Sequence, residues 1–169
     1  MNRLGYIFII IAALIVFSSC KAKYSLNGAT IPIEAKTITV SFFTNNTTLG
    51  NASISQKFTE KLRDVVSTQT RLALMKQNGD LLFEGTIVDY NVAPVSIQVN
   101  DLAASNRLTI TVNVKYTNRF DETKNFEQNF TRFSDFPANT AISSQEDVLL
   151  TEINRQLTED IFNKAFNNW

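Results

Sequence analysis

The side chains that most often carry chemistry are scarce in this chain of 169 residues, which contains no histidine and a single cysteine, Cys20. The absence of histidine excludes imidazole metal ligation and histidine acid–base catalysis. A single cysteine excludes an internal disulfide and any Cys-x-x-Cys redox site. A serine nucleophile would then need a lysine as its base, and no spacing of the two residue types supports such a pair.

Two pairs of adjacent acids are the remaining candidates for acid–base chemistry. Glu146 and Asp147 lie near the start of a predicted helix, where adjacent side chains point in different directions and acids complement the helix dipole. Asp121 and Glu122 lie in a predicted turn and are most simply explained as solvated charges. No glycine-rich phosphate-binding loop occurs in the sequence. We therefore expect a binding or assembly protein that is not an enzyme and has no cofactor or metal.

The charge balance argues against nucleic acid as a partner. Lysine and arginine total 16, and aspartate and glutamate also total 16, whereas phosphate binding needs a concentrated basic excess. Apolar and polar side chains alternate along residues 107–119. Arg107, Lys115 and Arg119 occupy the same alternate positions as the Thr and Asn residues of this segment, so all three should project from the solvent-facing side of a strand. Such a face could hold a phosphorylated lipid headgroup through forked arginine contacts. The alternative is an ordinary solvated face that is charged for solubility.

The segment before Cys20 has the pattern of a secretory signal peptide. Residues 1–19 contain Arg3, an apolar run from Leu4 to Phe17 and then two serines. The apolar run is shorter than the ~18 residues that a spanning helix usually needs, although a membrane anchor helix is the alternative. The small residues before the cysteine resemble a bacterial lipobox, with Phe17 in the place of the usual leucine. This pattern predicts cleavage before Cys20 and acylation of Cys20, and two acyl chains already give stable anchoring.

The residues that follow Cys20 indicate where a lipid-anchored protein would reside. Residues 20–36 are predicted to be a lipidated extended tether that leads into one domain at residues 37–169. The segment from Lys21 to Lys23 contains no acid, whereas an aspartate at the second mature position resembles a retention signal of the inner membrane. An acidic cluster like that of surface-export tags is also absent. We therefore expect the protein on the periplasmic side of the outer membrane.

The pattern of apolar residues predicts four strands and two helices. The strands are expected at residues 37–43, 80–95, 107–119 and 125–134. In the first strand Ile38, Val40 and Phe42 should share one side, and in the second Gly85 suggests a bulge or a close backbone contact. In the last strand Phe126 and Phe130 share a side, and Phe133 lies opposite.

Each predicted helix carries one apolar stripe, which is the pattern of a helix packed on a core. The first should begin near Asn51 or Ser53 and end around Thr70. The second should open with a capping box formed by Ser143 and Glu146 and continue to the last residue. Two such helices can cover one face of a four-stranded sheet, so we expect an α+β two-layer sandwich in the order β-α-β-β-β-α, with the other sheet face open.

Seven stretches of the sequence are informative when they are taken together. They are "SSC", "YSLNGATIP", "ITVSFFTNNT", "LRDVVSTQTRLAL", "DLLFEGTIVDYNVAPV", "NRLTITVNVKY" and "EDIFNKAFNNW". In this order they resemble the LptE lipoproteins, in a branch that is divergent from the enteric form. The resemblance covers nearly the whole chain after the signal peptide and implies two helices on a four-stranded sheet.

The resemblance implies a role in lipopolysaccharide transport and assembly at the outer membrane. LptE proteins act as a plug inside the LptD barrel, help that barrel fold and can bind lipopolysaccharide. The expected partners are therefore an LptD-like outer-membrane β-barrel, lipopolysaccharide and the membrane that holds the lipid anchor. The lipopolysaccharide-binding positions of the family are basic, but they do not align residue by residue with this chain, so the candidates Arg107, Lys115 and Arg119 rest on the strand pattern alone. Parts of the chain also resemble the LpoB and CsgG groups, and the alternative is a regulator of a cell-wall synthase or a secretion-pore subunit.

Overall fold

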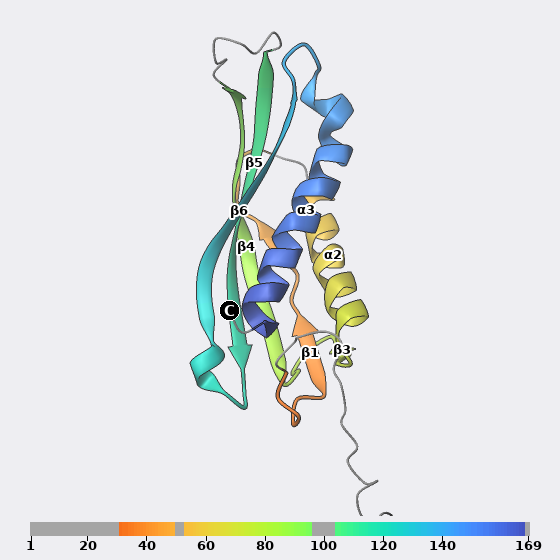
Figure 1. Ribbon diagram of the computed structural model, residues 1–169, viewed down its shortest axis with the longest axis vertical. Coiled ribbons are helices and arrows are strands. Elements are labelled where there is room, and N and C mark those ends of the chain that lie inside the picture. Colours follow the sequence, from red (N-terminus) through yellow and green to blue (C-terminus); the bar gives the residue numbers. More distant parts are fainter. Residues whose placement is uncertain (1–30, 50–52, 96–103, 168–169) are drawn as a thin grey trace, which may run out of the picture.

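The computed structural model describes residues 31–49, 53–95 and 104–167, so Cys20, the predicted signal peptide and Trp169 lie outside the described residues. In chain order the elements are β1 (Thr37–Val40), β2 (Thr44–Asn45), α2 (Ser53–Gln69), β3 (Ala73–Met75), β4 (Leu81–Val95), β5 (Ser105–Asn118), the 3-10 helix η1 (Glu122–Lys124), β6 (Phe126–Pro137) and α3 (Ile142–Phe166) (Figure 1).

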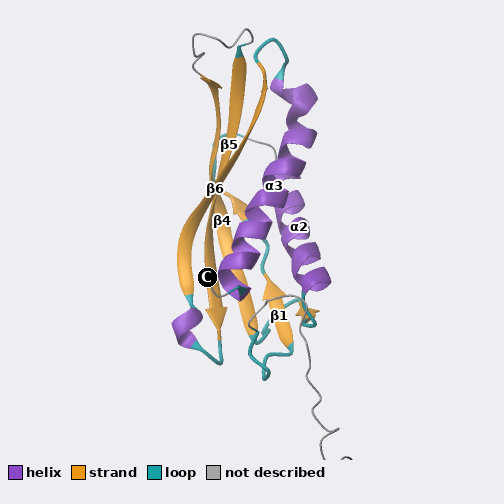
Figure 2. Cartoon of the chain, viewed as in Figure 1, coloured by secondary structure: helices purple, strands orange, loops and turns teal. Residues whose placement is uncertain are grey.

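The described residues form two layers, a mixed sheet and a pair of helices that cover one of its faces (Figure 2). The strand order is β3-β1-β4-β5-β6, and the short β2 pairs with β4 beside that path. Strand β1 is parallel to β3 and β4, whereas β4, β5 and β6 are long and antiparallel. The predicted α+β two-layer sandwich is therefore confirmed, and its sheet contains the short strands β2 and β3 in addition to the four predicted strands.

The core lies between the helices and the sheet. Alternate residues of β5 from Leu108 to Tyr116 are buried because they face the helices. The apolar stripes of the two helices are buried as predicted and include Ile54, Phe58, Leu62, Leu149, Ile153, Leu157 and Ile161. Burying a large apolar side chain contributes about 1.5–3 kcal/mol relative to leaving it exposed, so these stripes hold the two layers together.

The first predicted strand breaks in its middle, and the prediction for Phe42 is wrong. β1 ends at Val40, Phe42 is 55% exposed, and Phe43 is instead fully buried. The ring of Phe43 packs edge-on against that of Phe58 at a centroid distance of 5.0 Å. The Phe43 amide donates to the hydroxyl of Thr59 on α2 at 3.1 Å, which turns the backbone out of the regular strand. This break shifts the side-chain alternation by one residue.

The three-residue strand β3 was not predicted, and it leads into a connection that crosses β1. Asn78 has a φ of 58°, and a Cβ on Gly79 would lie 2.5 Å from the Thr39 amide nitrogen, so only glycine fits at position 79. The next residue, Asp80, accepts hydrogen bonds from the Lys36 amide at 2.9 Å, the Thr37 amide at 2.9 Å and the Thr37 hydroxyl at 2.8 Å. Asp80 therefore joins the chain before β1 to the start of β4.

The start of α3 differs from the predicted capping box. The N-cap residue is Ala141, which makes no side-chain cap, and Ser143 already lies inside the helix. The carboxylate of Glu146 accepts a hydrogen bond from the Tyr90 hydroxyl of β4 at 3.1 Å. The Glu146 side chain therefore joins α3 to the sheet and does not cap the start of the helix. The helix ends at Phe166 within the described residues.

Candidate functional site

The three long strands leave one sheet face uncovered, and we call it the open sheet face. It consists of the side chains of β4, β5 and β6 that point away from the helices, on the side opposite α2 and α3 in Figure 2. Its polar and aromatic members are Glu84, Thr86, Asp89, Asn91, Ser105, Arg107, Thr109, Thr111, Asn113, Lys115, Thr117, Glu127, Asn129, Thr131, Phe133 and Asp135. The predicted open face is therefore present, and it is polar.

Polar side chains on this face bond to one another across neighbouring strands. The hydroxyls of Thr111 and Thr131 lie 2.9 Å apart, and the Asn113 amide donates to the Asn129 carbonyl oxygen at 3.0 Å. Such cross-strand pairs each contribute roughly 0.2–1 kcal/mol. The middle of the open sheet face is therefore hydrophilic, and these two pairs hold part of it in place.

Arg107 is held by two neighbours on β6. Its Nε and Nη2 donate to the two carboxylate oxygens of Asp135 at 2.7 and 2.9 Å, and its guanidinium lies 3.6 Å above the ring of Phe133. This hydrogen bonding lowers the pKa of Asp135 and raises the pKa of Arg107. A phosphate could reach the guanidinium fork only by displacing the Asp135 carboxylate.

The other two predicted candidates lie in different surroundings. Lys115 projects from the open sheet face near the end of β5, where the strand register places it between Glu84 and Glu127. Arg119 follows the last residue of β5 and lies at the end of the sheet, where its amide donates to the Asp80 carbonyl at 3.3 Å. The Lys36 amide bond and the Thr37 hydroxyl bond lower the pKa of Asp80, and the charge of Arg119 adds to this effect.

The structure does not bring the three candidate bases together. Arg107 and Lys115 are eight residues apart on one strand, which at about 3.3 Å per residue separates their Cα atoms by roughly 26 Å. Across β4, β5 and β6 the open sheet face carries the bases Arg107 and Lys115 and the acids Glu84, Asp89, Glu127 and Asp135. The face is therefore acidic on balance, and the sequence argument missed these acids because the parity of one strand does not reveal its neighbours.

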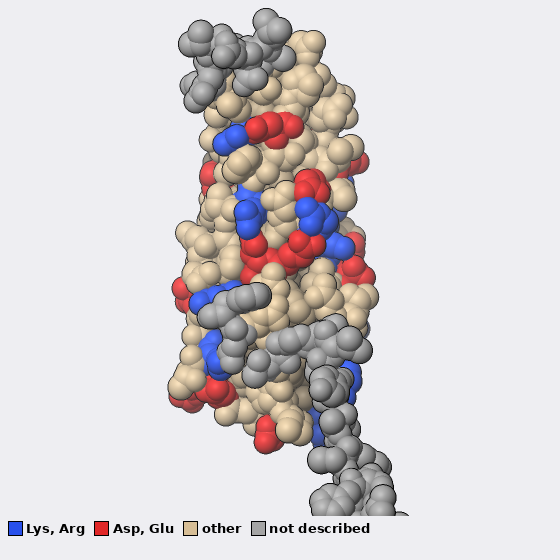
Figure 3. Space-filling view, in the orientation of Figure 1, with Lys and Arg blue, Asp and Glu red and all other residues tan. Residues whose placement is uncertain are grey.

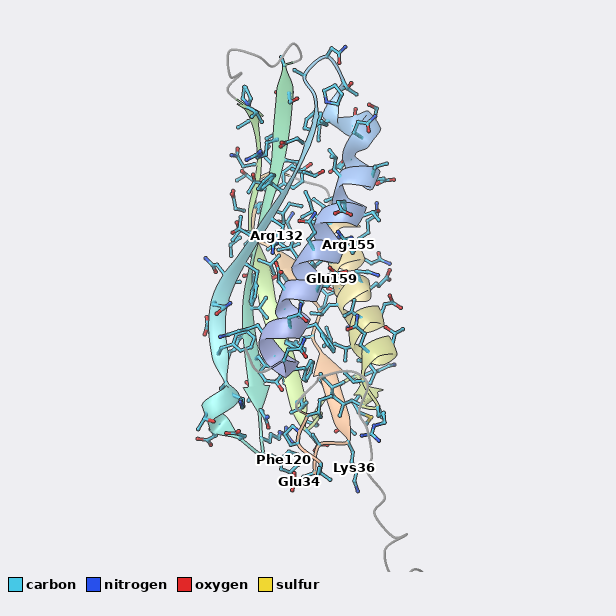
Figure 4. The ribbon with its side chains drawn as sticks, in the orientation of Figure 1. Glu34, Lys36, Phe120, Arg132, Arg155 and Glu159 are labelled. Carbon is cyan, nitrogen blue, oxygen red and sulfur yellow. The ribbon has the colours of Figure 1, made fainter. Side chains whose placement is uncertain are left out.

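Arg132 and Arg155 belong to a charged band on the helical side of β6. Figure 3 shows basic and acidic atoms intermixed across the middle of the molecule, where Figure 4 labels Arg132, Arg155 and Glu159. Arg132 donates to both carboxylate oxygens of Asp160 on α3, at 2.5 and 2.8 Å. Arg155 bonds to Glu159 and also to Glu152, whose pKa it lowers to about 2 with help from Gln156. The Arg132–Asp160 pair therefore ties β6 to α3, whereas the pairs of Arg155 lie within α3.

The acids that the sequence offered for catalysis are engaged elsewhere. Glu146 contacts Tyr90, while Asp147 forms an ion pair with Lys57 of α2 at 2.5 Å. Asp121 caps η1 by accepting from the Thr123 amide at 3.1 Å. Among residues 31–49, 53–95 and 104–167, no group of three or more His, Cys, Asp or Glu residues could hold a metal ion. None of the helices in this part of the chain is long and apolar enough to cross a membrane.

Comparisons with known proteins relate this chain to one family and to solved structures of lipoproteins. The model of the LptE family, described as lipopolysaccharide-assembly, matches residues 35–165. The crystal structure of a minor lipoprotein from Acinetobacter baumannii superposes with a TM-score of 0.52 and 14% identity, and the match covers 79% of this chain and 92% of that chain. For the solution structure of lipoprotein B from Nitrosomonas europaea the TM-score is 0.49 and the identity 15%, over 82% of this chain and 87% of that chain. No curated protein matches the chain by sequence.

Proposed function

Because this chain belongs to the LptE family of lipopolysaccharide-assembly lipoproteins, we propose that it is a plug and assembly partner of an LptD-like outer-membrane β-barrel and binds lipopolysaccharide. The family works without a cofactor. In this proposal the protein is not an enzyme. It is attached through acylated Cys20 to the periplasmic leaflet of the outer membrane.

The observation that carries the barrel partnership is the family match over residues 35–165, which spans every described strand and every described helix except the last residue of α3. The open sheet face adds physical support. The face is hydrophilic and carries cross-strand hydrogen bonds, and the lumen of a large outer-membrane barrel is polar. A hydrophilic surface can remain wet inside such a lumen without a desolvation cost.

Co-purification with the barrel tests this partnership. The mature lipoprotein and a tagged LptD-like barrel are expressed together, the barrel is purified from membranes, and the amount of bound lipoprotein is measured. A Thr111→Arg/Thr131→Arg variant, which adds bulk and charge to the open sheet face, should reduce the bound amount. The matched control is Thr151→Arg, because Thr151 is an exposed threonine on α3.

The proposal fails if the unmodified lipoprotein does not co-purify with the barrel. If only the α3 control loses binding, the barrel contacts the helical side. If affinity capture instead recovers a penicillin-binding protein or a homo-oligomeric pore, the alternative of a cell-wall regulator or secretion-pore subunit is supported.

The proposed lipopolysaccharide contacts remain Arg107, Lys115 and Arg119. Since these bases lie far apart along the sheet, they would contact separate phosphate groups and not enclose one. Triple charge reversal to glutamate should weaken the binding of lipopolysaccharide by the purified domain, and unchanged binding would refute this site while leaving the barrel partnership intact.

The lipid anchor is tested separately. Cys20→Ala should release the protein from the membrane fraction, and mass spectrometry of the unmodified mature chain should show acyl chains on its first residue. A mature chain without lipid mass that still fractionates with membranes would contradict the proposed anchor.

A further inference from the structure

We propose that the end of the domain nearest its amino-terminal tether touches the lipid surface directly through Ile33 and Phe120. This inference rests on the proposed attachment of lipid to Cys20. It adds a second, non-covalent membrane contact to that anchor and assigns the domain a definite orientation on the bilayer.

Two apolar side chains are exposed together at this end, which we call the anchor end. Ile33 is 95% exposed and Phe120 is 48% exposed. Asp80 links their segments, because its carboxylate accepts from the Lys36 and Thr37 amides and its carbonyl accepts from the Arg119 amide. Figure 4 shows the same proximity, with Phe120 labelled beside Glu34, the residue after Ile33.

Both side chains are presented by ordered turns. The Ala35 amide donates to the Pro32 carbonyl at 3.1 Å and closes a turn that has Ile33 at its tip. Phe120 and Asp121 donate their amides to the Asn118 side chain at 2.9 and 3.1 Å, which fixes the turn that follows β5. Ordered turns lose little further conformational freedom on binding, so an apolar contact at these positions is favoured.

The length of chain between Cys20 and the first described residue limits how far this end can move from the bilayer. Eleven residues lead from Cys20 to Ile31, which at 3.3–3.6 Å per residue is a maximum reach of about 36–40 Å. The anchor end is the part of the domain to which this tether connects. A covalent tether raises the effective concentration of the anchor end at the lipid surface, so that even two apolar side chains can contribute measurably.

The charges around these two residues are of both signs. Within three residues of Ile33 or Phe120 in the sequence stand the acids Glu34, Asp121 and Glu122 and the bases Lys36 and Arg119, and this mixture gives no strong attraction to an anionic headgroup. The contact is therefore apolar, and it should depend little on salt. A phospholipid bilayer fits this surface better than a phosphate ligand does.

Depth-dependent quenching of a tryptophan tests the contact. The single tryptophan, Trp169, is replaced by phenylalanine, and Phe120→Trp supplies the probe in the lipidated protein. The protein is reconstituted without any barrel into phosphatidylethanolamine and phosphatidylglycerol vesicles, with or without brominated acyl chains. We expect the emission of the Phe120→Trp variant to be lost with brominated lipid, because bromine quenches only a nearby indole.

Phe133→Trp is the matched control, because Phe133 is 47% exposed but lies on the open sheet face, away from the anchor end. Its emission should not change with brominated lipid. Adding Ile33→Asp to the Phe120→Trp protein should reduce the quenching, and raising the salt concentration should leave it unchanged. Equal quenching of both probes, no quenching of either, or quenching that disappears in salt would overturn the proposal.

A failure of the proposed membrane contact can be distinguished from a failure of the proposed function. The mass of the lipidated protein is measured first, and a chain without lipid on Cys20 overturns this inference together with the proposed anchor. Since the vesicles contain no barrel, a lack of quenching leaves the barrel partnership standing. Failure of barrel co-purification likewise leaves the membrane contact standing.

Discussion

The substitution Gly85→Ala should destabilise the domain strongly, because a methyl group at this position meets backbone atoms. A Cβ there would lie 2.1 Å from the Asn113 carbonyl oxygen of β5 and 2.6 Å from Cε1 of Phe43. A carbon normally approaches a carbonyl oxygen to roughly 3.3 Å, so β4 and β5 would have to separate locally by about 1 Å. The predicted close backbone contact at Gly85 is thereby confirmed, while the register irregularity of β4 lies further along, between Ile87 and Asp89.

The loss of stability in Gly85→Ala depends on whether the neighbouring atoms can move away from the new methyl group. Overpacking a core costs typically 1–3 kcal/mol, and because the obstructing oxygen belongs to the backbone of a central strand, we expect about 3 kcal/mol. For a domain of this size that loss corresponds to a decrease in Tm of roughly 10 °C. Thermal and urea unfolding of the unlipidated mature chain measure both quantities. The neighbouring substitution Thr86→Ala, on the open sheet face, should change the free energy of unfolding by less than about 0.5 kcal/mol.

A double substitution identifies which atom obstructs the methyl group. If the ring of Phe43 were the obstacle, Phe43→Leu would rescue Gly85→Ala, and the two free-energy changes would be far from additive. Because the carbonyl oxygen is closer than the ring, we expect no rescue. A Gly85→Ala protein as stable as the Thr86→Ala protein would refute the reasoning, since it would show that the spacing of β4 and β5 relaxes freely.

Three further predictions concern polar contacts. Hydrogen bonds from Lys36 and Thr37 hold the pKa of Asp80 below its usual value of 3.8. The stability that these bonds add is therefore present above pH 3.8 and is lost as the pH falls through the lowered pKa. When the free energy of unfolding is measured as a function of acid pH, this loss should occur in the unmodified protein and not in Asp80→Asn. Tyr90→Phe removes the hydrogen bond to Glu146 and should cost about 1 kcal/mol in urea unfolding. Because burial raises the pKa of Tyr90 to about 12, with the Glu146 charge adding to it, the phenol that ionises near this pH in a spectrophotometric titration should be missing from the variant. Arg107→Gln breaks a partly exposed ion pair and should cost only about 0.5 kcal/mol, less at high salt, when unfolding is compared at two salt concentrations.

The elements with long, regular patterns were predictable from the sequence. Helix α2 begins at Ser53, where the start was predicted, and ends one residue before the predicted boundary at Thr70. The alternation of β5 holds along the strand because one face packs on the helices and the other does not. In β6, Phe130 is buried and Phe133 is exposed on the opposite side, as the parity predicted.

The misses occur where contacts distant in sequence override a local pattern. β3 has only three residues, and its pairing with β1 depends on a parallel neighbour that is distant in sequence. Phe43 replaces Phe42 in the core because a glycine on β4 leaves room for its ring and a threonine on α2 binds its amide. Glu146 has the spacing of a capping box, yet a tyrosine on β4 takes its carboxylate. None of these partners can be identified from the neighbouring sequence.

The candidate site could be predicted only in part, because its partners also lie on strands that are distant in the sequence. The alternation of β5 correctly placed Arg107 and Lys115 on the open sheet face. Only the pairing of β5 with β4 and β6 shows that acidic residues lie beside each of these two bases. A phosphate at Arg107 would have to replace a forked carboxylate and would then lie near an unpaired Asp135. Contact with the polar wall of a barrel requires no such exchange, because the cross-strand pairs of the face can stay intact. The open sheet face is thus better suited to face the inner wall of a barrel than to bind a phosphorylated lipid. Unchanged lipopolysaccharide binding after the triple charge reversal would therefore not weaken the proposed barrel partnership.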